Sequence, residues 1–418
     1  MTPNEKREAT IARYKAAVAL KEADRIPVSP LVQGFPYYRA GYTIADIVYD
    51  TTLEKSKKAV MDYLKTYDPD LGLGFGVNNA MGPVFEKMEP YTMHWAGQPD
   101  CKINPNSIHQ WIEFPLLLDE EFDEFRRDRT GWSMNKALPR MCKIFDGFKN
   151  ISFRQGYDGF SYYSTMAELS TPEFREKMQR IWEVNDMYTD IMRRQFGVMK
   201  EIEDMGFVSF TDSGHLTPYD HYNDFLRGSI LGMMDLYENY DLVEQWCEEN
   251  WQDTEAFIKS LPIADGTKWF SMALHKAFDG FMNDEHYEKL YWKYLQKMIL
   301  AIIDSGRIPY VYTEGWYNTR LKYLKDVPAG KVIYHFEYVD MAKAKQELGD
   351  VACISGGFDR LLLERGTPEE VSDAVKKLID TCAPGGGFIF ETDAGVDYAK
   401  EENFAAMMET AREYGRYR

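Results

Sequence analysis

The sequence predicts an α/β protein, a distorted (β/α)8 TIM barrel that carries one large, mostly helical insertion after its second strand. Three observations lead to this prediction. Short apolar segments alternate with long amphipathic ones, which is typical of parallel strands joined by helices. There are about eight apolar segments, the number that closes a barrel of this kind. The length of 418 residues is also one that a single barrel with insertions can have.

The predicted strands are residues 27–33, 71–76, 207–212, 269–275, 308–314, 331–337, 351–356 and 387–391. Helices are expected between them. Residues 284–305 have apolar side chains at helical spacing, and residues 367–381 begin with Thr-Pro-Glu-Glu, an N-cap followed by proline in the first turn.

The predicted insertion is residues 77–206, which separate the second strand from the third and look helical over residues 173–205. Loops at the carboxyl ends of barrel strands form the substrate pocket. We therefore expect this segment to cover the mouth of one barrel domain that spans residues 1–418.

The composition is that of an ordinary globular protein, with 44% hydrophobic and 28% charged residues. A net charge of −18 argues against non-specific binding to nucleic acid and against docking on an anionic membrane. The first 25 residues are charged throughout, and no run of about 18 apolar residues occurs. Five scattered cysteines without a CxxC motif fit a reducing compartment. We expect a cytoplasmic protein.

Aromatic residues make up 15% of the chain, with 28 Tyr, 24 Phe and 9 Trp. Two interpretations stay open. The aromatic side chains belong either to a large core with tyrosines at the surface or to an aromatic-lined pocket near the chemistry.

Several titratable residues stand at the carboxyl ends of the predicted strands, where the side chains of a barrel converge on one mouth. They are Asp212, His275, Glu314, His335, Glu337, Glu391 and Asp393. Asp212 and Glu337 also suit structural roles, as a turn cap and a solvated carboxylate, and His335 also suits the core. Glu314 and His275 favour function, because each ends a long apolar strand where a buried charge is costly unless it is paired or used.

The sequence resembles the uroporphyrinogen decarboxylase superfamily, most closely its branch of corrinoid-dependent methyltransferases. The resemblance covers roughly residues 200–418, with a looser match at Arg25-Ile26-Pro27-Val28 and Gly41-Tyr42-Thr43. Its motifs are Leu226-Arg227-Gly228, Asp235-Leu236-Tyr237, residues 275–281 (HKAFDGF), Glu314-Gly315, Asp340, Ala344-Lys345, Leu348-Gly349, residues 353–357 (CISGG), residues 366–371 (GTPEEV) and residues 386–389 (GGFI).

The resemblance implies a distorted (β/α)8 barrel with its pocket at the strand ends, and either decarboxylation or methyl transfer. Decarboxylation of uroporphyrinogen, an octacarboxylate, needs a strongly cationic cleft. The matching N-terminal stretch, VQGFPYYRAGYT, supplies one arginine, Arg39. Methyl transfer to or from a corrinoid protein is therefore the activity that the resemblance favours.

Family members that activate a thiolate carry zinc on a His-x-Cys pair and a later Cys. The corresponding positions here are Tyr312, Glu314 and about Ala394, so a zinc site is doubtful. If zinc binds at all, Glu314 and His335 are its candidate ligands.

A carboxylate at position 314 suits removal of a methyl group from an ether oxygen, which needs an acid at the leaving oxygen. We expect Glu314, helped by His275 or His335, to be that acid. Crowding by neighbouring carboxylates would raise the pKa of one of them. The aromatic side chains of residues 35–42 and 77–206 would then line a pocket for a small methyl donor, such as a methoxylated aromatic compound. The candidate substrate-binding residues are Phe35, Tyr37, Tyr38, Arg39, Asp279, Tyr312, Trp316, Glu337, Glu391 and Asp393.

The expected partners are the methyl donor and a protein that carries the corrinoid, as in the anaerobic one-carbon metabolism that the resemblance implies. A homo-oligomer stays open. A halomethane or methylamine donor also stays open, and so do two other functions. One is a decarboxylase of a smaller organic acid, which needs a carboxylate-binding cation such as Arg39, Lys276 or Arg320. The other is a non-catalytic binding protein.

Overall fold

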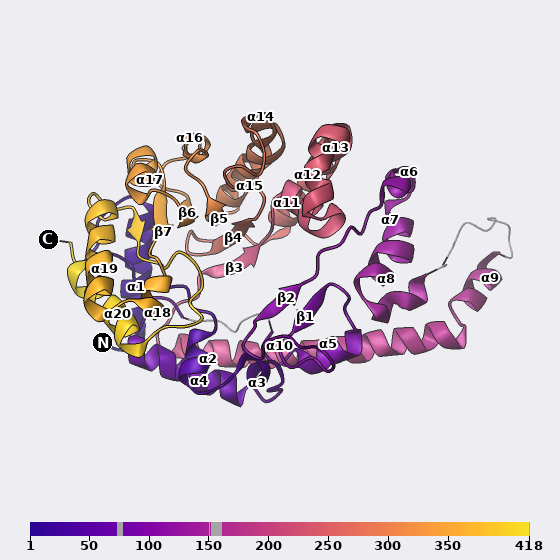
Figure 1. Ribbon diagram of the computed structural model, residues 1–418, viewed down its shortest axis with the longest axis horizontal. Helices are drawn as coiled ribbons and strands as arrows, with labels where there is room; N and C mark the ends of the chain where they lie inside the picture. The colour runs from indigo at the N-terminus through magenta and orange to yellow at the C-terminus, as the bar shows by residue number, and fades with distance from the viewer. Residues whose placement is uncertain (73–77, 150, 152–160, 418) are drawn as a thin grey trace.

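A six-stranded parallel sheet forms the centre of the computed structural model, which describes residues 1–72, 78–149, 151 and 161–417 (Figure 1). The strands follow one another in the sheet in the order β3-β4-β5-β6-β7-β8, and each pairs in parallel with the next. They are β3 (Thr211–Gly214), β4 (Trp269–Leu274), β5 (Ile308–Trp316), β6 (Ile333–Tyr338), β7 (Cys353–Gly356) and β8 (Phe388–Ile389). Parallel neighbours in sequence order confirm the predicted α/β class.

The last five predicted strands correspond to β4–β8, although β8 covers only two of its predicted residues. The third predicted strand, residues 207–212, is displaced, because β3 begins at Thr211. In the first two predicted strands, the residues that the structure describes form isolated contacts. Val28 is bridged in parallel to Phe390, and Leu71 to Val208.

Residues 73–76 of the second predicted strand lie outside the described residues. Before them, the Asp70 N–H donates to the Val28 carbonyl at 3.0 Å, which links the first two predicted strands. Together with the two bridges, this bond continues the backbone contacts beyond both edges of the sheet. Complete closure of an eight-stranded barrel stays a prediction.

Helices follow the strands on the outside of the sheet (Figure 1). They are α11 (Pro218–His221), α12 (Ser229–Glu238), α13 (Tyr240–Ser260), α14 (Asp284–His286), α15 (Lys293–Asp304), α16 (Leu321–Leu324), α17 (Met341–Leu348), α18 (Leu361–Arg365), α19 (Pro368–Cys382) and α20 (Glu401–Tyr414), with π-helical turns at Tyr222–Arg227 and Tyr287–Trp292. The predicted N-cap of α19 is confirmed, since Thr367 and Glu370 form a capping box.

The N-terminal helices are α1 (Pro3–Val18), α2 (Phe35–Arg39), α3 (Ile44–Val48) and α4 (Glu54–Tyr67). The predicted insertion holds α5 (Gly82–Met88), the antiparallel pair β1 (Met93–Trp95) and β2 (His109–Trp111), α6 (Phe122–Arg127), α7 (Arg129–Trp132), α8 (Leu138–Met141), α9 (Ser161–Glu168) and the 33-residue α10 (Pro172–Asp204). It is mostly helical, as predicted, and α10 matches the predicted residues 173–205 within one residue at each end.

An apolar cluster fills the interior of the sheet near the amino-terminal ends of the strands. Tyr14 of α1 packs there with Trp269, Tyr310 and Ile333, among others. Val311, the residue after Tyr310, belongs instead to the large cluster shared with the helices. This alternation follows from the two-residue period of a strand. Every second side chain of a strand therefore faces the interior.

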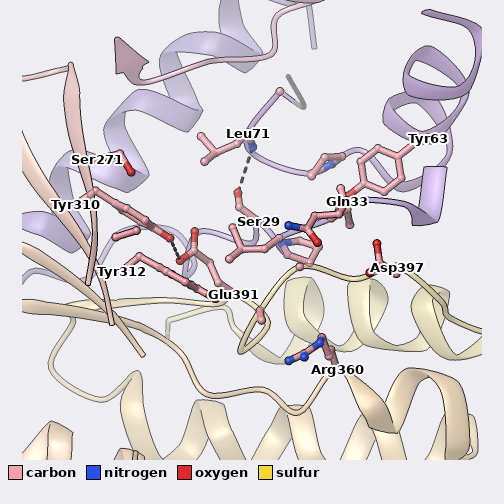
Figure 2. A pocket seen from close by; sticks show the side chains of 18 of the residues that line it. Ser29, Gln33, Tyr63, Leu71, Ser271, Tyr310, Tyr312, Arg360, Glu391 and Asp397 are labelled. Atoms are coloured by element: carbon pink, nitrogen blue, oxygen red, sulfur yellow. Dashed lines mark hydrogen bonds between the residues drawn. The ribbon is translucent and has the colours of Figure 1, made fainter. Parts of the chain in front are cut away.

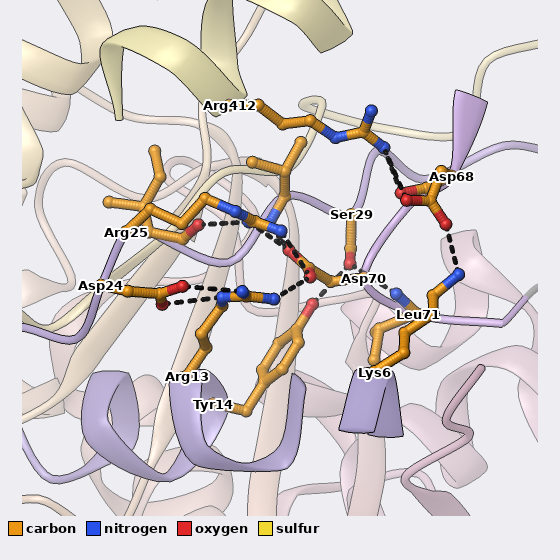
Figure 3. A network of polar contacts seen from close by, with 12 residues as sticks. Lys6, Arg13, Tyr14, Asp24, Arg25, Ser29, Asp68, Asp70, Leu71 and Arg412 are labelled. Atoms are coloured by element: carbon orange, nitrogen blue, oxygen red, sulfur yellow. Dashed lines mark hydrogen bonds and ion pairs between the residues drawn. The ribbon is translucent and has the colours of Figure 1, made fainter. Parts of the chain in front are cut away.

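A network of charged groups fixes α1 and the first two predicted strands at this end (Figure 3). Asp70 is 3% exposed. Its carboxylate accepts from Arg25 at 2.6 and 2.8 Å, from Arg13 at 3.0 Å and from the Val28 N–H at 2.7 Å. A buried carboxylate with this many donors holds the backbone that forms the floor of the pocket described below.

In the part of the chain that the structure describes, no helix is both long and apolar enough to cross a membrane. The five cysteines form no disulfide, and four of them are buried.

Candidate active site

A pocket of about 550 Å³ opens at the carboxyl ends of the strands (Figure 2). β4 contributes Ser271 and Ala273 to its lining, and β5 contributes Tyr310, Tyr312 and Glu314. The rest of the lining is Ser29, Pro30, Leu31, Val32, Gln33, Tyr63, Pro69, Leu71, Gly72, Arg360, Glu391, Ala394, Gly395 and Asp397. Of the seven strand-end residues that were predicted to converge, Glu314 and Glu391 line this pocket.

β5 sets the depth of this pocket. Tyr310, Tyr312 and Glu314 are spaced two residues apart, so all three face the interior at successive levels. Tyr310 lies at the inner end and Glu314 near the mouth. The pairing of β5 with β6 shifts register between Thr313 and Trp316, and Gly315 in this irregular stretch has a φ of +78° that favours glycine.

Glu314 has an environment that favours its protonated form. Burial raises the pKa of its carboxyl above the usual range, and the charge of Glu337 raises it further, whereas His275 opposes the rise. The side chain is 43% exposed, and its carboxyl faces the pocket. Glu337 is fixed beside it by a hydrogen bond from the Gly315 N–H at 2.7 Å.

His275 stands behind Glu314, with its Nε2 at 3.8 Å from Glu314 Oε1. Its Nδ1 lies 2.5 Å from Asp224 Oδ2. Burial alone would lower the pKa of His275, but the hydrogen bond to Asp224 and the charges of Asp220 and Glu314 raise it to about 9. His275 is therefore an imidazolium at neutral pH, held between two carboxyl groups.

Asp220 and Lys276 complete this group. Asp220 is fully buried and accepts hydrogen bonds from Tyr291 O–H at 2.5 Å and from the Lys276 N–H at 2.9 Å. Burial raises the pKa of its carboxyl to about 6. The Lys276 ammonium contacts Asp224 at 3.0 Å and Ser229 Oγ at 2.8 Å. The Asp220 carboxyl and the Lys276 ammonium are thus engaged by these neighbours, and neither residue lines the pocket.

The inner end of the pocket holds a second group, built from Tyr310, His335 and Glu391. Glu391 Oε2 accepts from Tyr310 O–H at 2.9 Å and lies 2.8 Å from His335 Nδ1. The other ring nitrogen, Nε2, is 2.9 Å from the Asp393 carbonyl oxygen. Because His335 is fully buried with both nitrogens engaged, the predicted direct roles of its ring as acid or metal ligand are not supported. Its contacts fit a residue that positions Glu391.

Four predicted substrate-binding residues are not brought to this pocket. Phe35 and Tyr37 are buried in the core, where Phe35 stacks on Phe404 at 4.4 Å. Tyr38 stacks on Tyr398 at 4.6 Å. Arg39 pairs with Glu401 at 2.6 Å and also with Asp62. Phe35, Tyr38 and Arg39 line a separate hollow beside α20. Side chains from residues 35–42 were expected to face the substrate, but apolar rings pack equally well on a neighbouring helix.

The other candidates lie around the mouth or in supporting positions. Asp393 binds Arg360 at 3.1 Å, and Asp279 accepts from the Thr319 hydroxyl at 2.6 Å. Trp316 is 58% exposed. Asp212 pairs with Arg307, as a structural carboxylate would.

The predicted insertion contributes no described residue to the pocket lining. The expectation that its aromatic side chains line this pocket is therefore wrong for residues 78–149, 151 and 161–206. Whether the insertion acts as a cap stays a prediction.

The sequence argument missed Asp220 and Asp224. They are four residues apart and so lie on one helical face after β3, a spacing that could have drawn attention to them. It also missed Ser29, Tyr63 and Asp397, which come from loops and a helix without a motif.

Among the described residues, no group of three or more His, Cys, Asp or Glu side chains is arranged to hold a metal ion. At the positions where the resemblance places zinc ligands, the chain offers Glu314 as the sole carboxylate, beside Tyr312 and Ala394. This donor set does not fit a zinc site of three protein ligands.

The chain was compared with known proteins. Residues 231–414 match the model of the family described as uroporphyrinogen decarboxylase (URO-D). This match confirms the resemblance that the sequence predicts. It also supports an enzyme of this superfamily. No curated protein matches the sequence.

Among solved structures, a methyltransferase from Methanosarcina mazei is similar to this chain, with a TM-score of 0.55 and 14% sequence identity. The match covers 97% of this chain and 98% of that one. At this identity the similarity shows a shared fold, and it extends over nearly the whole of both chains.

Proposed function

We propose that this protein is a methyltransferase that moves a methyl group from a small methoxylated aromatic donor to a corrinoid protein. The observation that carries the proposal is the arrangement of Glu314 and His275. A carboxyl with a raised pKa faces an aromatic-lined pocket, and an imidazolium held by Asp224 stands directly behind it. The URO-D family match and the methyltransferase with the same fold support this class of reaction.

The chemical difficulty in demethylating an ether is the leaving oxygen, which departs poorly as an anion. Glu314 in its protonated form gives a proton to that oxygen as the bond between methyl carbon and oxygen breaks, so that a neutral hydroxyl compound leaves. The imidazolium of His275 can then return a proton to Glu314. Asp224 holds the ring in place and stabilises its charge while it is protonated.

The donor would bind beside Tyr310 and Tyr312 of β5, which line the pocket. Tyr312 is fixed by stacking on the His335 ring, with centroids 4.6 Å apart. An aromatic donor gains both apolar burial and ring contacts against such walls. Its methyl group would point to the mouth, where Glu314 lies.

The corrinoid of the partner protein would supply the reduced cobalt that accepts the methyl group. The residues at the mouth fit the approach of a second protein, since Trp316 and Tyr338 are exposed and stack with centroids 5.4 Å apart. Zinc has no part in the proposal, because the donor set described above does not fit it.

A decarboxylase is less well supported, because it needs a free cation for the substrate carboxylate. Arg39 lies outside the pocket, Lys276 is held by Asp224, and Arg320 is buried against Asp284. Arg360 is the one cationic side chain in the described lining, and Asp393 already pairs with it.

The test is transfer of methyl groups from a panel of methoxylated aromatic compounds to a reduced corrinoid protein from the same genome. The change in corrinoid absorbance measures the transfer. Loss of a general acid typically lowers a rate by about 10²–10⁴. We expect losses in this range for Glu314→Gln and His275→Ala, and none for Glu285→Gln, a surface carboxylate paired with Lys289.

Unchanged rates in both site variants would contradict the proposed roles. Release of carbon dioxide from an organic acid without any corrinoid would favour the decarboxylase. The absence of turnover with every donor and partner would point to a binding protein.

A further inference from the structure

Glu391 has one carboxyl oxygen that the protein leaves without a partner. The residue is 1% exposed and lines the inner end of the pocket (Figure 2). Both of its side-chain hydrogen-bond contacts, from Tyr310 O–H and with His335 Nδ1, are made by Oε2. Across the described residues, no hydrogen bond is made to Oε1. Because Oε1 is not one of the enclosed side-chain atoms without a partner, it is open to the pocket, where a ligand can donate to it.

The protons of the His335–Glu391 pair can be counted from its contacts. The Asp393 carbonyl oxygen only accepts, so His335 Nε2 carries a proton and donates it. His335 Nδ1 lies 2.8 Å from Oε2 and 3.2 Å from Ser355 Oγ, and a second proton must lie between Nδ1 and Oε2, because two lone pairs at 2.8 Å would repel. That proton sits either on the ring or on the carboxyl. In both cases the pair has no net charge, and Oε1 carries no proton.

It follows that the group that the protein presents at the inner end is a hydrogen-bond acceptor without a net charge. We infer that this end of the pocket is a subsite for a hydroxyl group of the methyl donor, which donates its hydrogen to Glu391 Oε1. The donor would then be a methoxylated aromatic compound that also bears a hydroxyl at the end away from the reacting methyl group. This inference rests on the proposed function for the identity of the ligand, but the subsite itself rests on the contacts of Glu391.

Charge decides between a hydroxyl and the two charged alternatives. An ammonium group would donate equally well, but it would meet a neutral pair, so it would lose hydration without gaining an ion pair. A carboxylate group would meet an acceptor and be repelled. Ser29, Ser271 and Tyr310, other polar side chains near this end of the lining, are uncharged (Figure 2). A neutral hydroxyl is the group that satisfies Oε1 at the least cost of desolvation.

The experiment measures equilibrium binding by calorimetry, with the pure full-length protein and no corrinoid. The ligands are the three isomeric methoxyphenols, the matching dimethoxybenzenes, the methoxybenzylamines, which are ammonium ions at neutral pH, and the methoxybenzoates. A hydrogen bond to a buried acceptor corresponds to roughly tenfold or more in affinity. We expect at least one methoxyphenol to bind about tenfold more tightly than its dimethoxybenzene counterpart and than the charged compounds.

Two variants at one position separate the acceptor from other effects. In Glu391→Gln, the amide nitrogen can donate to His335 Nδ1 while the amide oxygen takes the place of Oε1, so the preference for the hydroxyl should be kept. Glu391→Met has a similar length but no acceptor, so the preference should disappear.

Equal binding of methoxyphenol and dimethoxybenzene by the natural protein would overturn the inference, and this outcome does not depend on whether the methionine variant folds. Tighter binding of the methoxybenzylamines would overturn it in favour of an ammonium subsite. The proposed function is tested separately, because a protein that binds methoxyphenols selectively but transfers no methyl group would keep the subsite and lose the reaction.

Discussion

Replacing Asp224 by Asn should lower the pKa of His275. Among the groups that raise the pKa of His275, the hydrogen bond to Asp224 is the largest. The ordinary value is 6.5 and the value in the folded protein is about 9. At 1.36 kcal/mol for each tenfold change in proton affinity, this rise corresponds to about 3 kcal/mol. Asn keeps the shape of the side chain but removes its charge, so we expect the pKa of His275 to fall from about 9 toward 6.5.

The sign of the effect on stability follows from proton binding. Between pH 6.5 and about pH 9, the folded protein keeps a proton on His275 that the unfolded chain releases. The stabilisation by the imidazolium is therefore fully present below pH 6.5 and is lost as the pH rises through about 9. In the natural protein this group should lower the free energy of unfolding by up to about 3 kcal/mol across that interval. In Asp224→Asn the decline should be smaller and should occur at lower pH.

The assay is an NMR titration of the histidine ring protons, with His275 identified by the loss of its signal in His275→Gln. The chain has seven histidines, so a single missing signal can be recognised. Urea unfolding at several pH values gives the matching free energies. Asp190→Asn is the control, because Asp190 pairs with Arg193 and Arg194 at the surface of α10. A His275 pKa that stays near 9 in Asp224→Asn, or that is near 6.5 in the natural protein, would refute the reasoning.

Two further substitutions test residues that support the backbone around the pocket. Asp70→Asn should lower the free energy of unfolding by about 3–5 kcal/mol, because it leaves Arg13 and Arg25 without their shared buried carboxylate. Urea unfolding measures this, and a loss below about 1 kcal/mol, as expected of a surface pair, would contradict it. Gly356→Ala should lower the melting temperature, since Gly356 has a φ of +84° and an added Cβ would lie 2.3 Å from the Phe336 carbonyl oxygen. The strain in φ alone costs about 1–2 kcal/mol. An unchanged melting temperature would show that this turn relaxes freely.

The sheet could be predicted from the sequence where strands are long and buried on both sides. β5 and β6 are continuous apolar runs with clear ends, and both are found within two residues of their predicted limits. The first two predicted strands are also apolar, but residues 27–33 include two prolines and residues 71–76 three glycines, and their described residues form isolated bridges. A period of hydrophobic residues cannot distinguish a full ladder from single bridges, because the difference lies in how the chain is held by distant groups such as Asp70.

The site was predictable at the ends of those same strands. His275 and Glu314 end neighbouring strands, and their contact follows from parallel pairing in which Leu274 lies opposite Thr313. The partner of His275 was not predictable in this way. Asp224 comes from a π-helical turn 51 residues earlier, and nothing in its local sequence indicates that it faces β4. The expectation that residues 35–42 line the pocket was wrong for a related reason, since composition alone does not fix which way a ring points.

The two clusters of titratable side chains in the pocket have different roles in the proposed reaction. Near the mouth, Glu314 and His275 hold protons that can move, because burial raises the pKa of Glu314 and, against the effect of burial, the hydrogen bond to Asp224 raises the pKa of His275. At the inner end, His335 and Glu391 Oε2 are engaged by each other and by neighbouring groups, so only the acceptor Oε1 faces the substrate. A donor held by its hydroxyl at the fixed end presents its other end to the movable protons. A single acidic pocket can in this way both orient a neutral substrate and activate its leaving group, without a free cation in the described lining.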